Sequence, residues 1–325
     1  MERPPKAAKT EKFTQQEEKV LESLYKLCIQ YIATNLHMVE SFRGFPELVA
    51  ADIFKEADKL SKFDILTQPH RNMKLFCEIY PNNVLSSLNI SSCYVGLNYS
   101  VECFETFSGL HSLDVSSCFL GDHHEFLSHI AHLKCLINLN LRKNSLSDKG
   151  VRSLYAPFML LKRGPEHLKV LDISENGCIS EKSVKKLKCF KNLQKIDITG
   201  TWCIHIVNLQ VKEMGSEWRL CPEKTDSLMS ITNEGWASEA VQKWEITVRN
   251  SIPNPTFVFS RGITRSTAVV QDSNAVSFVP GYRLTLHRNP QTESDTPQET
   301  VTTNSEQDDS IDSIIDLYKV KDKPS

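Results

Sequence analysis

Five side chains of kinds that bind metal ions lie close together near the middle of the sequence: His123, His124, His129, His132 and Cys135. The HExxH pattern of zinc proteases places its two histidines four residues apart, on one face of a helix. His124 and His129 are five residues apart, so their rings would diverge by about 140° around a helix. Glu125, His129 and His132 share a face, but a solvated helix surface explains them better. We therefore expect no metal site.

A second cluster is basic and consists of Lys182, Lys185, Lys186, Lys188 and Lys191. A phosphate contact is one interpretation and a solvated helix face is the other. No aromatic residues alternate with these lysines, so they do not form a surface on which nucleic-acid bases could stack. Phosphate-binding glycine loops, nucleophile elbows and flanked Cys/His pairs are absent from the sequence. We expect a non-enzymatic protein with no cofactor and no nucleic-acid partner.

The composition of the 325 residues also narrows the choices. The 38 basic and 40 acidic residues leave a formal net charge of -2, which provides no global positive field for nucleic acid or acidic membranes. No segment approaches the roughly 18 apolar residues of a membrane span, and the N-terminal residues are charged where a signal peptide would be apolar. The 10 cysteines form no CxxC pair. We expect an intracellular protein, cytoplasmic or nuclear, that does not bind membranes.

A repeated pattern, L-x-x-L-x-L-x-x-N/C-x-L, determines the expected fold. Its five copies begin at Leu85, Leu110, Leu136, Leu168 and Leu193, which are 25, 26, 32 and 25 residues apart. Leucine-rich repeats have similar spacings, of about 20 to 29 residues. The alternating apolar residues of each copy predict a short strand, and its Asn or Cys should bond the backbone where the strand ends.

The fold class that we predict is α/β, a leucine-rich repeat solenoid with a parallel concave sheet and convex helices. Stacked repeats need covered ends. Helical periodicity predicts an N-terminal cap, and the segment around Trp236 and Trp244 predicts a C-terminal lid over the last strand. Polar, acidic composition predicts a disordered tail. The expected units are a disordered lead at 1–18, a helical cap at 19–80, five repeats at 81–205, a C-terminal cap at 206–250 and a disordered acidic tail at 251–325.

The outward strand positions give a first candidate binding surface on the concave face. It consists of Asn89, Asp114, Asn140, Arg142, Asp172 and Asp197. These side chains are polar and mostly acidic, so a basic peptide or helix would complement them. Such repeats also carry Asp or Asn at these positions without binding a ligand, and that alternative stays open.

The N-terminal cap contains a second candidate surface. Its pattern Ser23-Leu24-x-x-x-Cys28-x-x-x-Ile32 resembles the BC box of Elongin-binding receptors. The following Phe45-Pro46-x-x-Val49-x-x-x-Ile53 resembles their cullin-contacting box. Leu24 and Cys28 lie one helical turn apart and could enter a partner's groove together. The same residues could equally well cap the first repeat.

A third candidate lies in the tail, where Ile314, Ile315 and Leu317 follow Asp308, Asp309 and Asp312. This arrangement resembles a SUMO-interacting motif, which adds a strand to the edge of a partner's sheet. A generic short helix is the alternative interpretation.

Several less generic segments resemble the leucine-rich repeat-containing protein 42 family. They include GFPELVA at 44–50, APFMLLKRG at 156–164 and EGWASEAVQKWE at 234–245, within a resemblance that runs from Ser23 to Glu245. The resemblance implies a repeat scaffold that binds partners and has no enzymatic activity. Two functions are therefore expected: substrate recognition in an Elongin BC cullin-RING ubiquitin ligase, or regulatory or assembly scaffolding through the concave face without a ligase.

Overall fold

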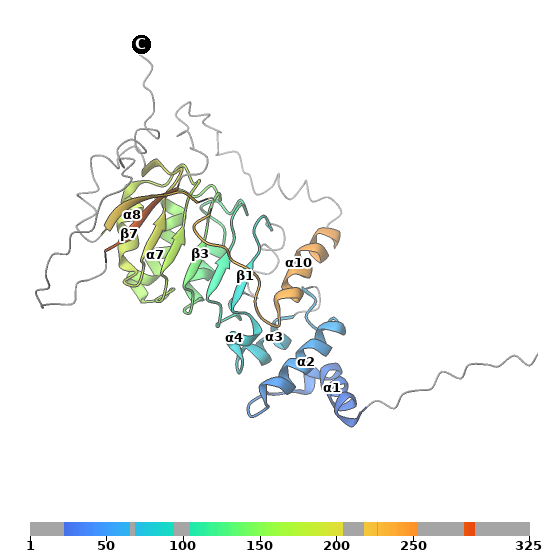
Figure 1. Cartoon of the computed structure of the whole chain (residues 1–325). Helices are drawn as coiled ribbons and strands as arrows, with labels where there is room; N and C mark the ends of the chain where they lie inside the picture. The colour runs from blue at the N-terminus through green and yellow to red at the C-terminus, as the bar shows by residue number, and fades with distance from the viewer. Residues whose placement is uncertain are drawn as a thin grey trace, which may run out of the picture.

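A seven-stranded sheet runs through the molecule (Figure 1). The computed structural model describes residues 23–65, 69–93, 104–203, 218–225, 227–251 and 283–289. The five repeat copies form the parallel strands β1 (Ser87–Asn89), β2 (Ser112–Asp114), β3 (Asn138–Asn140), β4 (Val170–Asp172) and β5 (Lys195–Asp197). The apolar residue at the centre of each strand is buried in the same register. The expected α/β class with a parallel sheet is confirmed.

Short helices return the chain from one strand to the next. They are α6 (Phe126–His129) with η3 (Ile130–His132), α7 (Asp148–Leu161), and α8 (Glu181–Lys186) with η4 (Leu187–Cys189). Their inward apolar residues, such as Leu127, Leu154 and Leu187, are buried in the core that the strands share. The repeat period therefore supplies one strand and one helical return per unit.

Buried asparagines tie successive repeats together. The Asn144 side chain donates to the carbonyls of Val115 and Leu141 at 2.9 and 3.0 Å and accepts from the Cys118 N–H at 3.0 Å. Asn176 makes the equivalent bonds one repeat later, including 3.0 Å to the Leu141 carbonyl. The asparagine of the pattern thus satisfies main-chain groups of two neighbouring repeats, as its position predicts.

The N-terminal helices pack around an aromatic cluster at the β1 end of the sheet. They are α1 (Leu24–Thr34), η1 (Leu36–Met38), α2 (Glu47–Lys59), α3 (Pro69–Cys77) and α4 (Pro81–Val84). Phe54 stacks on Phe63 at 4.3 Å between ring centroids, and Phe42 stacks on Phe76 at 4.5 Å. These four rings are fully buried, and they form a core that continues into the first repeat.

Part of the segment that was expected to form a disordered tail instead forms a strand at the far end of the sheet. Strand β7 (Arg283–Arg288), from within 251–325, pairs antiparallel with β5, and β6 (Trp218–Glu223) pairs with the other edge of β7. Leu284 and Leu286 alternate with polar residues and are buried. A segment of six residues with this alternation can pair with the edge of the repeat sheet and bury its apolar side chains, although the composition around it is polar.

Helix α10 (Ser238–Ser251) also lies elsewhere than expected. It packs beside the N-terminal helices and not over the last strand (Figure 1). The Trp244 indole N–H donates to the Phe63 carbonyl at 2.7 Å, and Lys243 pairs with Asp58 at 2.9 Å. Its apolar periodicity predicted a buried face correctly but did not specify the surface that covers it. Among the described residues, no helix is long and apolar enough to cross a membrane.

Candidate functional site

The outward strand residues Asn89, Asp114, Asn140, Asp172 and Asp197 form one straight row across the sheet, which we call the acidic row. In each of them a side-chain oxygen accepts a hydrogen bond from the main-chain N–H two residues further on, at 2.8 to 3.0 Å. Each of these hydrogen bonds stabilises the turn in which its strand ends. The row therefore has a structural role in every repeat.

The row is largely occupied by bonds within the chain. Asp114 and Asn140 are buried, and the Asn140 amide donates to the second Asp114 oxygen at 2.9 Å. The half-buried Asn89 donates from its side chain to the Ile231 carbonyl at 3.0 Å. These three side chains therefore offer few polar atoms to which a partner could bond.

At the β7 end of the row, two carboxylates are paired with one internal arginine. The Arg283 guanidinium bonds Asp197 and lies 3.1 Å from Asp172, and all three side chains are almost completely buried. Burial and the neighbouring Asp197 raise the pKa of Asp172 to about 6, although hydrogen bonds from Ser174 and the charge of Arg283 oppose the rise. Arg283 of the chain itself therefore pairs with the carboxylates that were expected to attract a basic ligand.

Arg142, the sixth predicted residue of this face, lies beside the row and is only partly exposed. Its guanidinium bonds the Glu175 carboxylate, with 2.9 Å from its Nε. An approaching partner would have to compete with this ion pair, whose side chains are about one third and one quarter exposed, at 31% and 24%.

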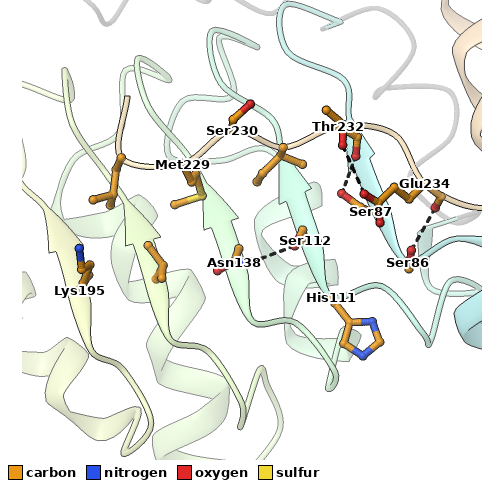
Figure 2. Close-up of a pocket in the computed structure, with 13 residues that line it drawn as sticks. Ser86, Ser87, His111, Ser112, Asn138, Lys195, Met229, Ser230, Thr232 and Glu234 are labelled. Atoms are coloured by element: carbon orange, nitrogen blue, oxygen red, sulfur yellow. Dashed lines mark hydrogen bonds between the residues drawn. The ribbon is translucent and has the colours of Figure 1, made fainter. Parts of the chain in front are cut away.

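A segment that links β6 to α10 covers the same face of the sheet (Figure 2). We call residues 227–234 the strap. Ser87 donates to the Thr232 carbonyl at 2.5 Å, and the Ser86 hydroxyl donates to the Glu234 carbonyl at 3.3 Å. Between strap and sheet remains a groove of about 630 Å³, whose sheet side is lined by Ser87, Ser112, Asn138, Val170 and Lys195. None of the six residues predicted for the concave face is among those that line this groove, which follows the first residue of each strand instead.

The second candidate surface is exposed to a much greater extent. On helix α1, Ile29 and Ala33 face the core, and Ile32 packs partly against it. Leu24 and Tyr31 are 77% and 69% exposed, and Cys28 between them is also exposed. Helix α1 therefore has an apolar core face and a second, solvent-facing apolar stripe.

The residues of the cullin-like box lie at the start of the neighbouring helix α2. Pro46 is the residue before the helix, and Phe45 packs edge-on against Phe42 at 5.5 Å while remaining 39% exposed. Ile53 is buried, so it belongs to the core. Leu48, which neither pattern uses, is 80% exposed and adds to the apolar surface.

Ile314, Ile315 and Leu317 of the tail motif lie outside the described residues. Arg283 and the strap were not recognised as parts of the binding face, because both lie in segments without a repeat pattern. The alternation in RLTLHR was the available signal for β7.

The comparison with known proteins agrees with the repeats. No protein-family model matches the chain. It is 36% identical over 231 residues to leucine-rich repeat-containing protein 42 of Danio rerio, which covers 70% of this chain and 56% of that protein. It is 34% identical over 228 residues to the Homo sapiens protein of that name, covering 69% and 53%, and 32% identical over 236 residues to that of Xenopus laevis, covering 71% and 56%. The chain spans little more than half the length of these curated relatives. The resemblance to the leucine-rich repeat-containing protein 42 family is thereby confirmed over about 70% of the chain.

Proposed function

We propose that this chain is a non-enzymatic protein-interaction scaffold, built as a leucine-rich repeat solenoid, whose docking surface is the exposed apolar face of helices α1 and α2. The family name and the parallel repeat units support the scaffold. The exposed stripe on α1 is the observation that carries the choice of surface. The docking surface consists of Leu24, Leu27, Cys28, Tyr31 and Leu48.

The exposure of these side chains supports docking over capping. A residue that served only to cap the fold would be buried in its core, as Ile29 and Ala33 are. Leu24 and Leu48 instead leave most of their side chains in water, at 77% and 80% exposure. Leu24, Leu27 and Tyr31 recur at spacings of three and four residues along α1, and large apolar side chains grouped on one helix face are typical of protein-binding sites.

The finer proposal is that the partner is Elongin C and that a cullin binds next to it, which would make the chain a substrate receptor of a ubiquitin ligase. Leu24 and Cys28 present a large and a small apolar side chain one helical turn apart on the free side of α1. That is the arrangement expected for a helix that enters a groove. Phe45 and Pro46 lie at the start of the adjacent helix α2, where a second subunit could reach them.

The test is copurification of the full chain with Elongin B and C. The variant Leu24→Ala with Cys28→Phe should abolish the complex, because one change removes the anchor and the other blocks close approach. Leu160→Ala with Cys178→Phe makes the same two chemical changes at other exposed positions and should leave the complex intact. Circular dichroism checks that both variants remain folded.

The outcomes separate the two scaffold functions. A complex that only the α1 variant loses supports the ligase receptor. If the folded wild-type chain forms no complex with Elongin B and C, the ligase proposal fails. The alternative, a regulatory or assembly scaffold without a ligase, would place a partner in the groove below the strap, where Lys195→Glu should then weaken binding to that partner.

A further inference from the structure

Two histidines and one glutamate meet on the surface of the second repeat. Nδ1 of His132 lies 3.3 Å from Oε1 of Glu105, and Nδ1 of His129 contacts the same oxygen. One potential ligand atom from each of the three residues lies within 4.8 Å of the other two. Helical spacing places Glu125 on the face of His129 and His132, whereas the carboxylate that reaches them comes from Glu105, 24 residues before His129.

Buried aromatic residues position this cluster from beneath. Phe104, which precedes Glu105, packs edge-on against Phe126 with 5.2 Å between ring centroids. Both phenylalanines are fully buried. Phe126 begins helix α6, which carries His129, and the adjoining η3 carries His132. The two chain segments that supply the ligands are therefore held together by the core and not only by the polar contacts.

We propose that Glu105, His129 and His132 bind a single divalent transition metal ion of the zinc type, with solvent completing the coordination. Ligand atoms around tetrahedral zinc lie about 3.3 Å apart, given metal–ligand distances of about 2.0 to 2.1 Å. The spacing of His132 and Glu105 already matches this value, and the His129 contact has to lengthen to admit the ion. Imidazole with carboxylate suits zinc, nickel or copper, whereas magnesium and calcium prefer sites made of oxygen alone.

The position of the site indicates what the ion would do. Glu105 also lines a groove of about 360 Å³ together with Cys77, the last residue of helix α3, and Glu78, which follows it. A bound ion would link the turn at Glu105 to α6, where the N-terminal helices meet the repeats. One coordination position would face solvent, because Glu105 and His132 are 42% and 50% exposed.

The rival explanation is a hydrogen-bonded cluster in which both histidines donate to the carboxylate and no ion binds. Cobalt(II) is a suitable probe because it replaces zinc and reports its ligands by colour. Histidine and carboxylate ligands give visible ligand-field bands, whereas thiolates would add charge-transfer absorption in the near ultraviolet. The structure describes nine cysteines, whose thiolates could bind cobalt elsewhere, and near-ultraviolet absorption would reveal such binding.

The experiment titrates the full chain with Co²⁺ and then displaces it with Zn²⁺. Wild-type protein should bind one equivalent without thiolate bands. His129→Ala, His132→Ala and Glu105→Gln should each weaken binding by more than about tenfold, since even changes to residues behind a ligand cost 10-fold or more. The controls His123→Ala and His167→Ala remove exposed histidines elsewhere and should bind as wild type does.

Two results would overturn the proposal. One is a wild-type chain that binds no cobalt at equimolar concentrations. The other is binding that the control variants weaken as much as the cluster variants do. Glu105→Gln keeps the size of the side chain, so it tests the site even if an alanine variant unfolds, and circular dichroism verifies the fold of each protein.

Discussion

The buried Arg283 offers the sharpest test of how strand β7 is held. In Arg283→Met the side chain keeps much of its bulk but loses its charge and its bonds to Asp172 and Asp197. Removing one partner of a buried ion pair costs about 3 to 5 kcal/mol, because the other charge stays buried without compensation. We expect a loss of this size in the free energy of unfolding near neutral pH, measured by urea denaturation.

The pH dependence of this loss tests the mechanism. In the wild-type protein the pKa of Asp172 is raised to about 6, by burial first and by Asp197 second. The ordinary value is about 4, so between about pH 4 and 6 the folded state binds more protons than the unfolded state. Stability therefore falls as the pH rises through that window. Without Arg283 the pKa of Asp172 should rise further, which extends the fall to higher pH.

The loss in the free energy of unfolding caused by Arg283→Met should consequently be about 1 to 2 kcal/mol smaller at pH 5 than at pH 7.5. Arg219→Met is the matched control, because Arg219 is exposed on the neighbouring strand β6, and its effect should stay within about 0.5 kcal/mol. Adding Asp172→Asn and Asp197→Asn to Arg283→Met should restore most of the stability, since no buried charge then remains. A loss under about 1 kcal/mol, or an equal loss at both pH values, would refute this reasoning.

Three further predictions concern the packing. Asn144→Leu removes the side-chain bonds to two repeats and leaves main-chain groups unsatisfied, so urea denaturation should show a loss of about 2 to 4 kcal/mol. Trp244→Phe removes the 2.7 Å bond to Phe63 while keeping an aromatic ring, and should cost about 1 to 2 kcal/mol; an unchanged midpoint would mean that the bond does not help to hold α10. Maleimide labelling followed by mass spectrometry should modify the exposed Cys28 and Cys178 first. Three buried thiols, whose pKa burial raises to about 12, should react only on unfolding: Cys77, Cys118 and Cys203.

The repeat strands could be predicted because each repeat encodes its own local structure. In LDVSSC of the second copy, Leu113 and Val115 alternate into the core, Asp114 bonds the N–H of Ser116, and Cys118 ends the pattern. These interactions join residues two to five positions apart, so their spacing is visible in a short segment. The same reasoning predicted the acidic row correctly as a row, with its register across five strands.

The candidate sites depended on contacts that no short segment contains. The spacing of the repeats suggested that the acidic row was available for a ligand. In the structure its last carboxylate is paired with Arg283, which lies 86 residues after Asp197. Helical spacing grouped His129 and His132 with Glu125, but in the structure the carboxylate that contacts both histidines is that of Glu105. For Leu24, the sequence was equally compatible with capping the repeats and with docking a partner, and the exposure of its side chain favours docking.

The sequence by itself determined the repeat unit, the parallel sheet and the polarity of its outward row, because these follow from side-chain periodicity and hydrogen bonds within one or two turns of chain. The tertiary structure decided which surfaces are covered. Helix α10 packs on the N-terminal helices, the strap crosses the sheet, and β7 and β6 extend the sheet beyond β5. Apolar periodicity states that a face must be buried but carries no information about its partner, since that choice depends on how all the elements pack together.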